Sequence, residues 1–290
     1  MTRTPDATTA STAALREVSY TSQWTAAARA LETEREGERL FEDPYARELA
    51  APKGFELLDK YGGGGLREFV AIRTRYLDDA IREALADTDI RQVVLIAAGM
   101  DTRAFRLTPL PDDVTVYEVD HADLLTEKRR RLERLGAQPT VRRQEVGADL
   151  ATDWLPALTT AGFDPGRPTL WIPEALLFFL TEEQSSTLLR TLRSASAPGS
   201  RLAVDILSRS LLVNPATQLF LAALRKDGIP WLFGTDEPAG FLAGNGWTVR
   251  EVKEPGQAGA GEGRWPYEVQ PPNVPGVARN WLITAEPDSD

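Results

Sequence analysis

Cysteine is absent from this chain of 290 residues, and histidine occurs once. Without cysteine there is no disulfide, no thiolate catalysis and no zinc site of the cysteine type. A single histidine leaves too little material for a histidine metal site or a Ser-His-Asp triad. The composition therefore predicts that the chain has no metal site.

The sequence also lacks an N-terminal apolar run typical of signal peptides, and it has no run of about 18 apolar residues that would span a membrane. The formal net charge is −10, whereas a nucleic-acid partner favours a basic face. We therefore expect a cytoplasmic protein that binds neither membrane nor nucleic acid. The length predicts one domain with appendages, and leaves the oligomeric state open.

An apolar strand, a turn of small residues and an acidic strand end follow one another in the middle of the chain. The continuous apolar run 93–96 is typical of a buried strand, and it ends at Ala97-Ala98-Gly99, before a helix expected near Asp101. A second apolar strand over 114–119 ends in Asp120. In Rossmann-like folds an acid at this place binds ribose hydroxyls. The pattern predicts an adenosine-containing cofactor.

The turn after the first strand helps to choose the cofactor. It contains one glycine, Gly99, and lacks the G-x-G-x-x-G fingerprint of dinucleotide sites. A pyrophosphate needs several free N–H groups at a helix start, whereas S-adenosylmethionine has no phosphate. The turn favours S-adenosylmethionine over NAD, although an ordinary strand-to-helix connection has the same composition.

Strands and helices alternate through the rest of the chain. The helix beginning with Thr181-Glu182-Glu183-Gln184 carries a capping box. Repeated strand–helix units predict an α/β protein with a doubly wound, mostly parallel sheet. The strands are expected over residues 91–97, 114–119, 140–146, 169–173, 201–207, 247–252 and 281–285.

Several segments carry narrower expectations. Residues 15–49 look helical, and the glycine run 62–65 predicts a hinge or loose loop before a long amphipathic helix. The run 128–131 (KRRR) indicates a solvated helix face. The low-complexity segment 255–263 (PGQAGAGEG) predicts a mobile loop.

Two charged residues fall in apolar surroundings. Arg73 lies three residues after Val70 and four before Leu77, on the apolar stripe of its helix. Glu174 directly precedes the apolar segment 176–180. A charge in such a place must find a partner, so each residue is expected either to contact a ligand or to form a buried ion pair within the protein.

The chain resembles the leucine carboxyl methyltransferase family, including its bacterial branch of S-adenosylmethionine-dependent methyltransferases and polyketide O-methyltransferases. The matching segments follow the family's order over nearly the whole chain. They are AAARALETEREGERLFEDPYA (26–46), IRTRYLDDAI (72–81), LIAAGMDTRAFRL (95–107), YEVDHADLLTEK (117–128), ADL (148–150), WIPEALLFFL (171–180), APGSRLAVDIL (197–207) and RNWLITA (279–285).

The resemblance implies a Rossmann-like class I methyltransferase fold with seven strands, the last of them antiparallel. It implies an N-terminal helical cap or lid over residues 1–88 and a cofactor-binding catalytic domain over 89–290. Seven residues would bind S-adenosylmethionine: Arg73 at its carboxylate, Ala97 and Gly99 along its methionine part, Asp120 at the ribose, Asp149 and Leu150 beside the adenine, and Glu174 near its amino-acid moiety.

The resemblance further implies an O-methyltransferase acting on a carboxylate or phenolic hydroxyl of a small molecule, in secondary metabolism. It identifies no catalytic residue, and the lone His121 is more typical of a helix start than of a general base. The chain departs from the family at Ala97, where glycine is usual, and at Phe179, where tyrosine is usual. These departures leave open a non-catalytic adenosyl-binding protein on the same scaffold. An NAD-linked oxidoreductase is the other alternative, against which the missing glycines argue.

Overall fold

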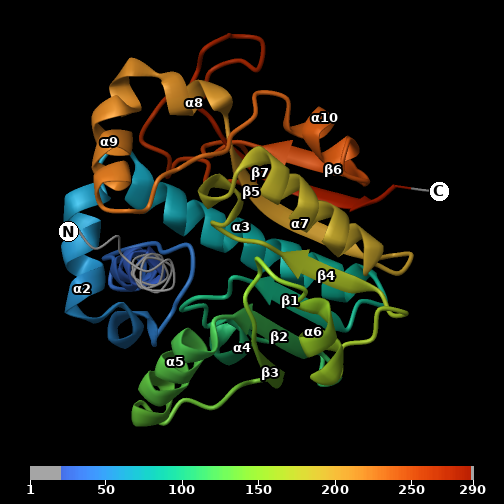
Figure 1. The fold of residues 1–290 in the computed structure, drawn as a ribbon. Coiled ribbons are helices and arrows are strands. Elements are labelled where there is room, and N and C mark those ends of the chain that lie inside the picture. The colour runs from blue at the N-terminus through green and yellow to red at the C-terminus, as the bar shows by residue number, and fades with distance from the viewer. Residues whose placement is uncertain (1–20, 289–290) are drawn as a thin grey trace, which may run out of the picture.

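The computed structural model describes residues 21–288, and its centre is a seven-stranded sheet in the order β3-β2-β1-β4-β5-β7-β6 (Figure 1). Strands β1 to β5 pair in parallel, while β7 is antiparallel to both β5 and β6. This confirms the doubly wound sheet with an antiparallel last strand. The strands are β1 Gln92–Ile96, β2 Thr115–Asp120, β3 Arg142–Gly147, β4 Thr169–Ile172, β5 Arg201–Leu207, β6 Trp247–Lys253 and β7 Asn280–Pro287.

Helices cover both faces of the sheet because successive strand residues point to opposite sides. In β1, Val93 and Leu95 belong to one apolar cluster, whereas Val94 and Ile96 belong to another. The first cluster includes residues of α2 (Ala46–Tyr61), α3 (Leu66–Asp87), α4 (Arg103–Arg106) and α5 (Ala122–Arg134). The second includes residues of α6 (Leu155–Thr160), α7 (Glu182–Ser194) and α10 (Pro238–Ala243).

Local capping signals place two of the later helices. The Thr181 hydroxyl accepts from the backbone N–H of Gln184, and the Gln184 side chain accepts from the N–H of Thr181, which confirms the capping box at the start of α7. Asn214 caps a short 3₁₀ helix, η2 (Pro215–Thr217), which leads into α9 (Gln218–Lys226). Helix α8 (Arg209–Val213) and α9 follow the end of β5.

The low-complexity loop 255–263 is packed in part. Ala260 is 1% exposed, and its carbonyl accepts from the N–H of Gly256 at 2.7 Å. Gly261 has φ +74°, and a Cβ there would lie 2.4 Å from Ile72 of α3. Part of the expected mobile loop is therefore packed, because Gly261 allows close approach to α3, a contact that composition does not reveal. Residues 258, 259, 262 and 263 are exposed, and the mobility of the loop stays a prediction.

The basic run 128–131 is not solvated throughout, and the expectation was wrong for Lys128. Arg129 and Arg130 are exposed as expected, but the Lys128 side chain is fully buried, with Nζ 2.8 Å from a Glu118 oxygen. Arg143 contacts the same carboxylate. Burial alone would raise the pKa of Glu118, but these two cations outweigh it and lower the pKa. The lysine thus belongs to a buried ion pair between α5 and β2.

The N-terminal helices pack directly on the sheet. Residues 21–33 are helical, and the part of the expected 15–49 helical region before residue 21 lies outside the described residues. Ala28, Leu49 and Leu77 from the cap share one apolar cluster with strand residues of β1. The division into a cap over 1–88 and a domain over 89–290 stays a prediction. Within residues 21–288, no helix is long and apolar enough to cross a membrane.

Candidate functional site

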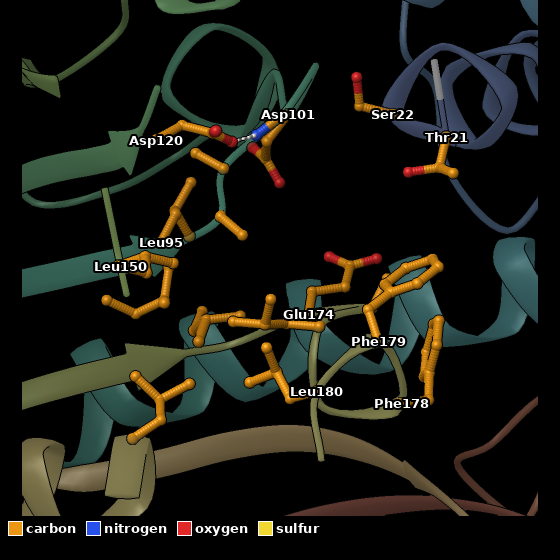
Figure 2. A pocket seen from close by; sticks show the side chains of 18 of the residues that line it. Thr21, Ser22, Leu95, Asp101, Asp120, Leu150, Glu174, Phe178, Phe179 and Leu180 are labelled. Atoms are coloured by element: carbon orange, nitrogen blue, oxygen red, sulfur yellow. Dashed lines mark hydrogen bonds between the residues drawn. The ribbon is translucent and has the colours of Figure 1, made fainter. Parts of the chain in front are cut away.

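A cavity of about 670 Å³ lies at the carboxyl ends of the parallel strands (Figure 2). Open α/β sheets bind ligands at this edge, where the strand order reverses; here the reversal falls between β1 and β4. All seven predicted cofactor-binding residues line the cavity: Arg73, Ala97, Gly99, Asp120, Asp149, Leu150 and Glu174. Their assignment to the cofactor stays a prediction, but the fold brings them into one place.

Asp120 connects the ends of β1 and β2. One of its oxygens accepts from the Gly99 N–H and the other from the His121 N–H, both at 2.7 Å. Gly99 has φ +48°, and a Cβ there would lie 2.8 Å from the Ser22 Cβ, so only glycine fits. Burial raises the pKa of Asp120, and the two amide donors offset part of this effect. The carboxylate is thus held in place by the turn it faces.

Ala97 occupies the left-handed region, with φ +56°. This conformation costs a residue with a Cβ about 1–2 kcal/mol, and glycine adopts it freely. The departure from the family's usual glycine therefore places backbone strain in the wall of the cavity. The same conformation would accept glycine without rearrangement.

Replacing Ala97 by glycine is expected to raise the free energy of unfolding by about 0.5–1 kcal/mol. The backbone strain that the glycine relieves in the folded state exceeds the cost of the extra conformational entropy that it gives the unfolded chain. Ala98→Gly is the matched control: its φ is not positive, so it should lower the free energy of unfolding. Urea unfolding of the ligand-free proteins measures both. Equal losses in the two variants would show that the φ of Ala97 stores no strain.

Arg73 and Glu174 form a buried ion pair on the cavity wall. The Nε of Arg73 donates to Glu174 at 2.9 Å, and its Nη1 donates to Asp205 at 3.0 Å. The structural alternative considered for Arg73 is therefore present. These two hydrogen bonds use Nε and Nη1 of Arg73, so its Nη2 is a further donor on a side chain that lines the cavity. The ion pair and a contact between Arg73 and a cofactor are therefore compatible.

Arg103, which the sequence reasoning missed, completes this arrangement. It contacts Glu174 at 2.6 Å, Asp78 at 2.7 Å and also Asp101. Asp78 could have been found: like Arg73, it lies on the apolar stripe of α3, three residues before Ile81. The pairing of Arg103 with Asp78 and Glu174 could not, because these two residues come from α3 and from the end of β4, far from Arg103 in sequence.

These contacts form a continuous cluster, the buried ion cluster. Its ion pairs run from the cap through α3 and α4 to the ends of β4 and β5. The cluster contains four guanidinium groups and five carboxyl groups: Arg29, Arg73, Arg103 and Arg106, with Asp43, Asp78, Asp101, Glu174 and Asp205. Each carboxyl group contacts at least one of the four arginines, and the cluster has a formal net charge of −1 when all its groups are ionised.

The ionisation of Glu174 follows from this cluster. Burial alone would raise its pKa, but the charges of Arg103 and Arg73 outweigh burial and lower the pKa to about 2. Glu174 is thus ionised throughout the neutral range. The folded pKa lies below the ordinary value, so its contribution to stability is complete above about pH 4.5 and is lost as the pH falls toward 2.

Glu174→Gln tests this pH dependence. We expect its Tm to lie below that of the wild type by a constant amount between about pH 7 and 5, and the difference to shrink between about pH 4.5 and 2. Thermal unfolding in a series of buffers measures it. A Tm difference that does not change down to about pH 3 would contradict the low pKa.

The side of the cavity predicted to bind the adenine is partly exposed. Asp149 is exposed, and its side chain accepts from the Ala151 N–H at 2.9 Å, so it stabilises the loop after β3. Leu150 is half-buried and lines the cavity next to it. His121 occupies the N-cap position of α5 without a side-chain capping bond. It lies directly after Asp120, on the side predicted to bind the cofactor.

The opposite side of the cavity is apolar. Figure 2 shows Asp120 and Leu150 on one side of Glu174, and Phe178 and Phe179 on the other. Glu174 thus lies between two parts of the cavity. We call the part with Asp120 the polar half, which Leu95 and Leu150 also line. We call the part with the phenylalanine rings the apolar half, which Thr21 and Ser22 also line. Sequence reasoning could not separate a core from a substrate role for the apolar run 176–180. The structure shows that several of its side chains line the cavity.

Comparison with known proteins identifies the family of this chain. Residues 22–193 match the family model described as leucine carboxyl methyltransferase. A Mycolicibacterium smegmatis protein named "Putative S-adenosyl-L-methionine-dependent methyltransferase" is 41% identical over 259 residues, covering 82% of this chain and 86% of the relative. A Streptomyces coelicolor protein of similar name is 38% identical over 250 residues, covering 80% and 82%.

Solved structures show the same fold. A structure titled as a putative methyltransferase from Thermobifida fusca matches with a TM-score of 0.58 at 20% identity, covering 90% of this chain and 94% of the other. A DUF574 family protein from Streptomyces avermitilis matches with a TM-score of 0.60 at 16% identity, covering 90% and 97%. The fold, the position of the cavity and the family match together show that this chain belongs to the leucine carboxyl methyltransferase family.

Proposed function

We propose that this chain is an O-methyltransferase that methylates a carboxylate or phenolic oxygen of a small molecule. Its family membership makes it an S-adenosylmethionine-dependent methyltransferase, and the acceptor is the step beyond that. The observation that carries the proposal is a single cavity whose polar half and apolar half meet at Glu174. Such a cavity accommodates a cofactor and a second molecule side by side.

The polar half fits the cofactor by charge. The charged residues that line the cavity are mostly acidic, so the cavity favours a ligand with net positive charge. They are six carboxyl groups (Asp101, Asp120, Asp149, Asp153, Glu174 and Glu183) and three guanidinium groups (Arg29, Arg73 and Arg103). S-adenosylmethionine carries an ammonium, a carboxylate and a sulfonium, and it supplies an activated methyl group. The excess of carboxyl groups disfavours a pyrophosphate, which speaks against the NAD-linked alternative.

Each lining residue then has a defined task. Asp120 accepts hydrogen bonds from ribose hydroxyls while the turn amides fix its orientation. Glu174 pairs with the ammonium group, and Arg73 offers Nη2 to the carboxylate. Leu150 provides an apolar surface for the adenine. Together these residues orient the methyl group toward the apolar half, and the apolar walls exclude water.

The proposed reaction makes little use of proton transfer by the protein. Glu174 has a pKa of about 2 and two arginine partners, so it is a poor base at neutral pH. His121 directly follows Asp120, and Asp120 lies on the far side of Glu174 from the phenylalanine rings. A carboxylate acceptor, with a pKa of about 4, arrives ionised. A phenol, with a pKa of about 10, would depend more strongly on pH.

The sequence carries further expectations that belong to this proposal. We expect a cytoplasmic enzyme of secondary metabolism that acts on a small molecule and binds neither nucleic acid nor a membrane.

Isothermal titration with S-adenosylmethionine, S-adenosylhomocysteine and NAD tests the cofactor, followed by a methyl-transfer screen over carboxylates and phenols with product detection by mass. We expect micromolar binding of S-adenosylhomocysteine, no heat with NAD, and a mass gain of one methyl group on an acceptor oxygen. NAD binding alone would favour the oxidoreductase. Cofactor binding with no transfer to any acceptor would favour the non-catalytic alternative.

A further inference from the structure

We propose that the acceptor is a planar aromatic molecule bound in the apolar half of the cavity. This proposal rests on the proposed function, since it names the class of acceptor that the same site takes. Four rings from three separate segments carry it: Phe69, Phe178, Phe179 and Trp231, all of which line the cavity. We call this part of the cavity the aromatic chamber.

The rings of the aromatic chamber are placed by the fold. Phe178 and Phe179 lie in the 3₁₀ helix η1 (Leu177–Phe179), which follows Glu174. The Phe178 ring centroid is 4.8 Å from that of Trp231 and 4.7 Å from that of Phe179, with tilted planes. The Phe178 carbonyl accepts from the Leu232 N–H at 2.6 Å, which attaches the loop of Trp231 to η1. The wall is therefore pre-organised.

Two of these rings are not ordinary core residues. Phe178 is 5% exposed, but Phe179 and Trp231 are only half-buried although both line the cavity. Packing within the protein thus leaves part of each of these rings uncovered. A bound ring would complete their burial and add aromatic pairs of the kind already present in the wall.

The aromatic chamber also borders the reactive end of the site. Phe69 lies one turn before Arg73 in α3, and the Arg73 guanidinium lies 5.3 Å from the Phe69 ring centroid. Phe179 lies five residues after Glu174 and points into the cavity beside it in Figure 2. An aromatic acceptor in the chamber would therefore bring its oxygen to the boundary between the two halves.

Aromatic and saturated acceptors with the same carbon skeleton differ in planarity and in the electrostatics of their rings. Both bury similar apolar area, but only the aromatic one gains the electrostatic complementarity of ring faces and edges. Contacts with two wall rings therefore predict a preference of about tenfold, or about 1.4 kcal/mol, for the aromatic molecule.

Isothermal titration of 2-naphthoate and of decahydro-2-naphthoate into the protein saturated with S-adenosylhomocysteine tests this. The two probes share their carboxylate and carbon skeleton, and differ in aromaticity. We expect 2-naphthoate to bind about tenfold more tightly. In Trp231→Leu and Phe179→Leu the ratio should fall toward one, whereas Phe241→Leu, which removes a ring of α10 packed on Phe233, should keep it.

Each of three results would overturn the proposal. The wild type could bind the two probes with equal affinity, it could bind neither probe, or the affinity ratio could be unchanged in both chamber variants. Failure of S-adenosylhomocysteine to bind would instead refute the proposed function. The two probes would then be titrated into the ligand-free protein, and their ratio would still report on the aromatic chamber. The wild-type ratio decides even where a chamber variant fails to fold.

Discussion

Asp78→Asn is expected to lower the free energy of unfolding of the ligand-free protein by about 3–5 kcal/mol, the usual cost of breaking a buried ion pair. The Asp78 side chain is fully buried and accepts from Arg103 at 2.7 Å and from Arg106 at 2.6 Å. Once its charge is removed, the ion-pair partner of Arg106 within the described chain is Asp43, at 3.8 Å. A buried guanidinium is then poorly compensated.

Asp79→Asn provides the matched control. Asp79 is the next residue of the same helix, and its substitution removes the same charge. Its partners Arg75 and Arg82, however, are 47% and 41% exposed. Exposed pairs contribute about 0–1 kcal/mol, so Asp79→Asn should cost less than about 1 kcal/mol. Urea unfolding near neutral pH compares the two. Equal losses would mean that the buried ion cluster adds no more stability than surface pairs do.

Asp120→Asn is expected to weaken the binding of S-adenosylhomocysteine about a hundredfold. Hydrogen bonds to a charged group contribute about 1.5–3 kcal/mol each, and the ribose of the proposed cofactor complex would lose its charged acceptor. In the wild type the two Asp120 oxygens accept hydrogen bonds from the N–H groups of Gly99 and His121. In the variant the asparagine NH₂ would face one of these N–H groups, and two donors cannot form a hydrogen bond. The turn itself should therefore be disturbed.

Asp123→Asn removes the same charge from an exposed position in the first turn of α5. Calorimetric titration should give it the affinity of the wild type. Thermal unfolding of both ligand-free variants separates a loss of ligand contacts from a loss of folded protein. A folded Asp120→Asn protein with wild-type affinity would remove Asp120 from the cofactor site.

The strand and helix layout could be predicted because its signals are local. The apolar run 93–96 became β1, buried on both faces. The Thr181–Gln184 box caps α7 through bonds within four residues. The acid ending β2 lines the cavity because parallel strands end at one edge of the sheet. Each of these inferences needs only neighbouring residues and the rules of one fold class.

The loop 255–263 and Lys128 show where local reasoning ends. Composition makes a glycine-rich segment look mobile throughout, yet Gly261 in this segment packs against Ile72 of α3. A lysine in a basic run looks solvated, yet Lys128 faces a buried Glu118 from β2. In both cases the decisive neighbour is distant in sequence, and the same residues would suit a surface equally well.

By itself the sequence determined the doubly wound fold, the family and the residues expected around the cofactor. Only the tertiary structure decided which charges pair and what shape the acceptor half takes. Arg73 contacts Glu174 and Asp205, which are 101 and 132 residues away. Periodicity and capping act over one or two helical turns, whereas the partner of a buried charge depends on which elements meet. The aromatic chamber has the same origin, because its rings come from α3, η1 and the loop after α9 and form one wall only in the folded chain.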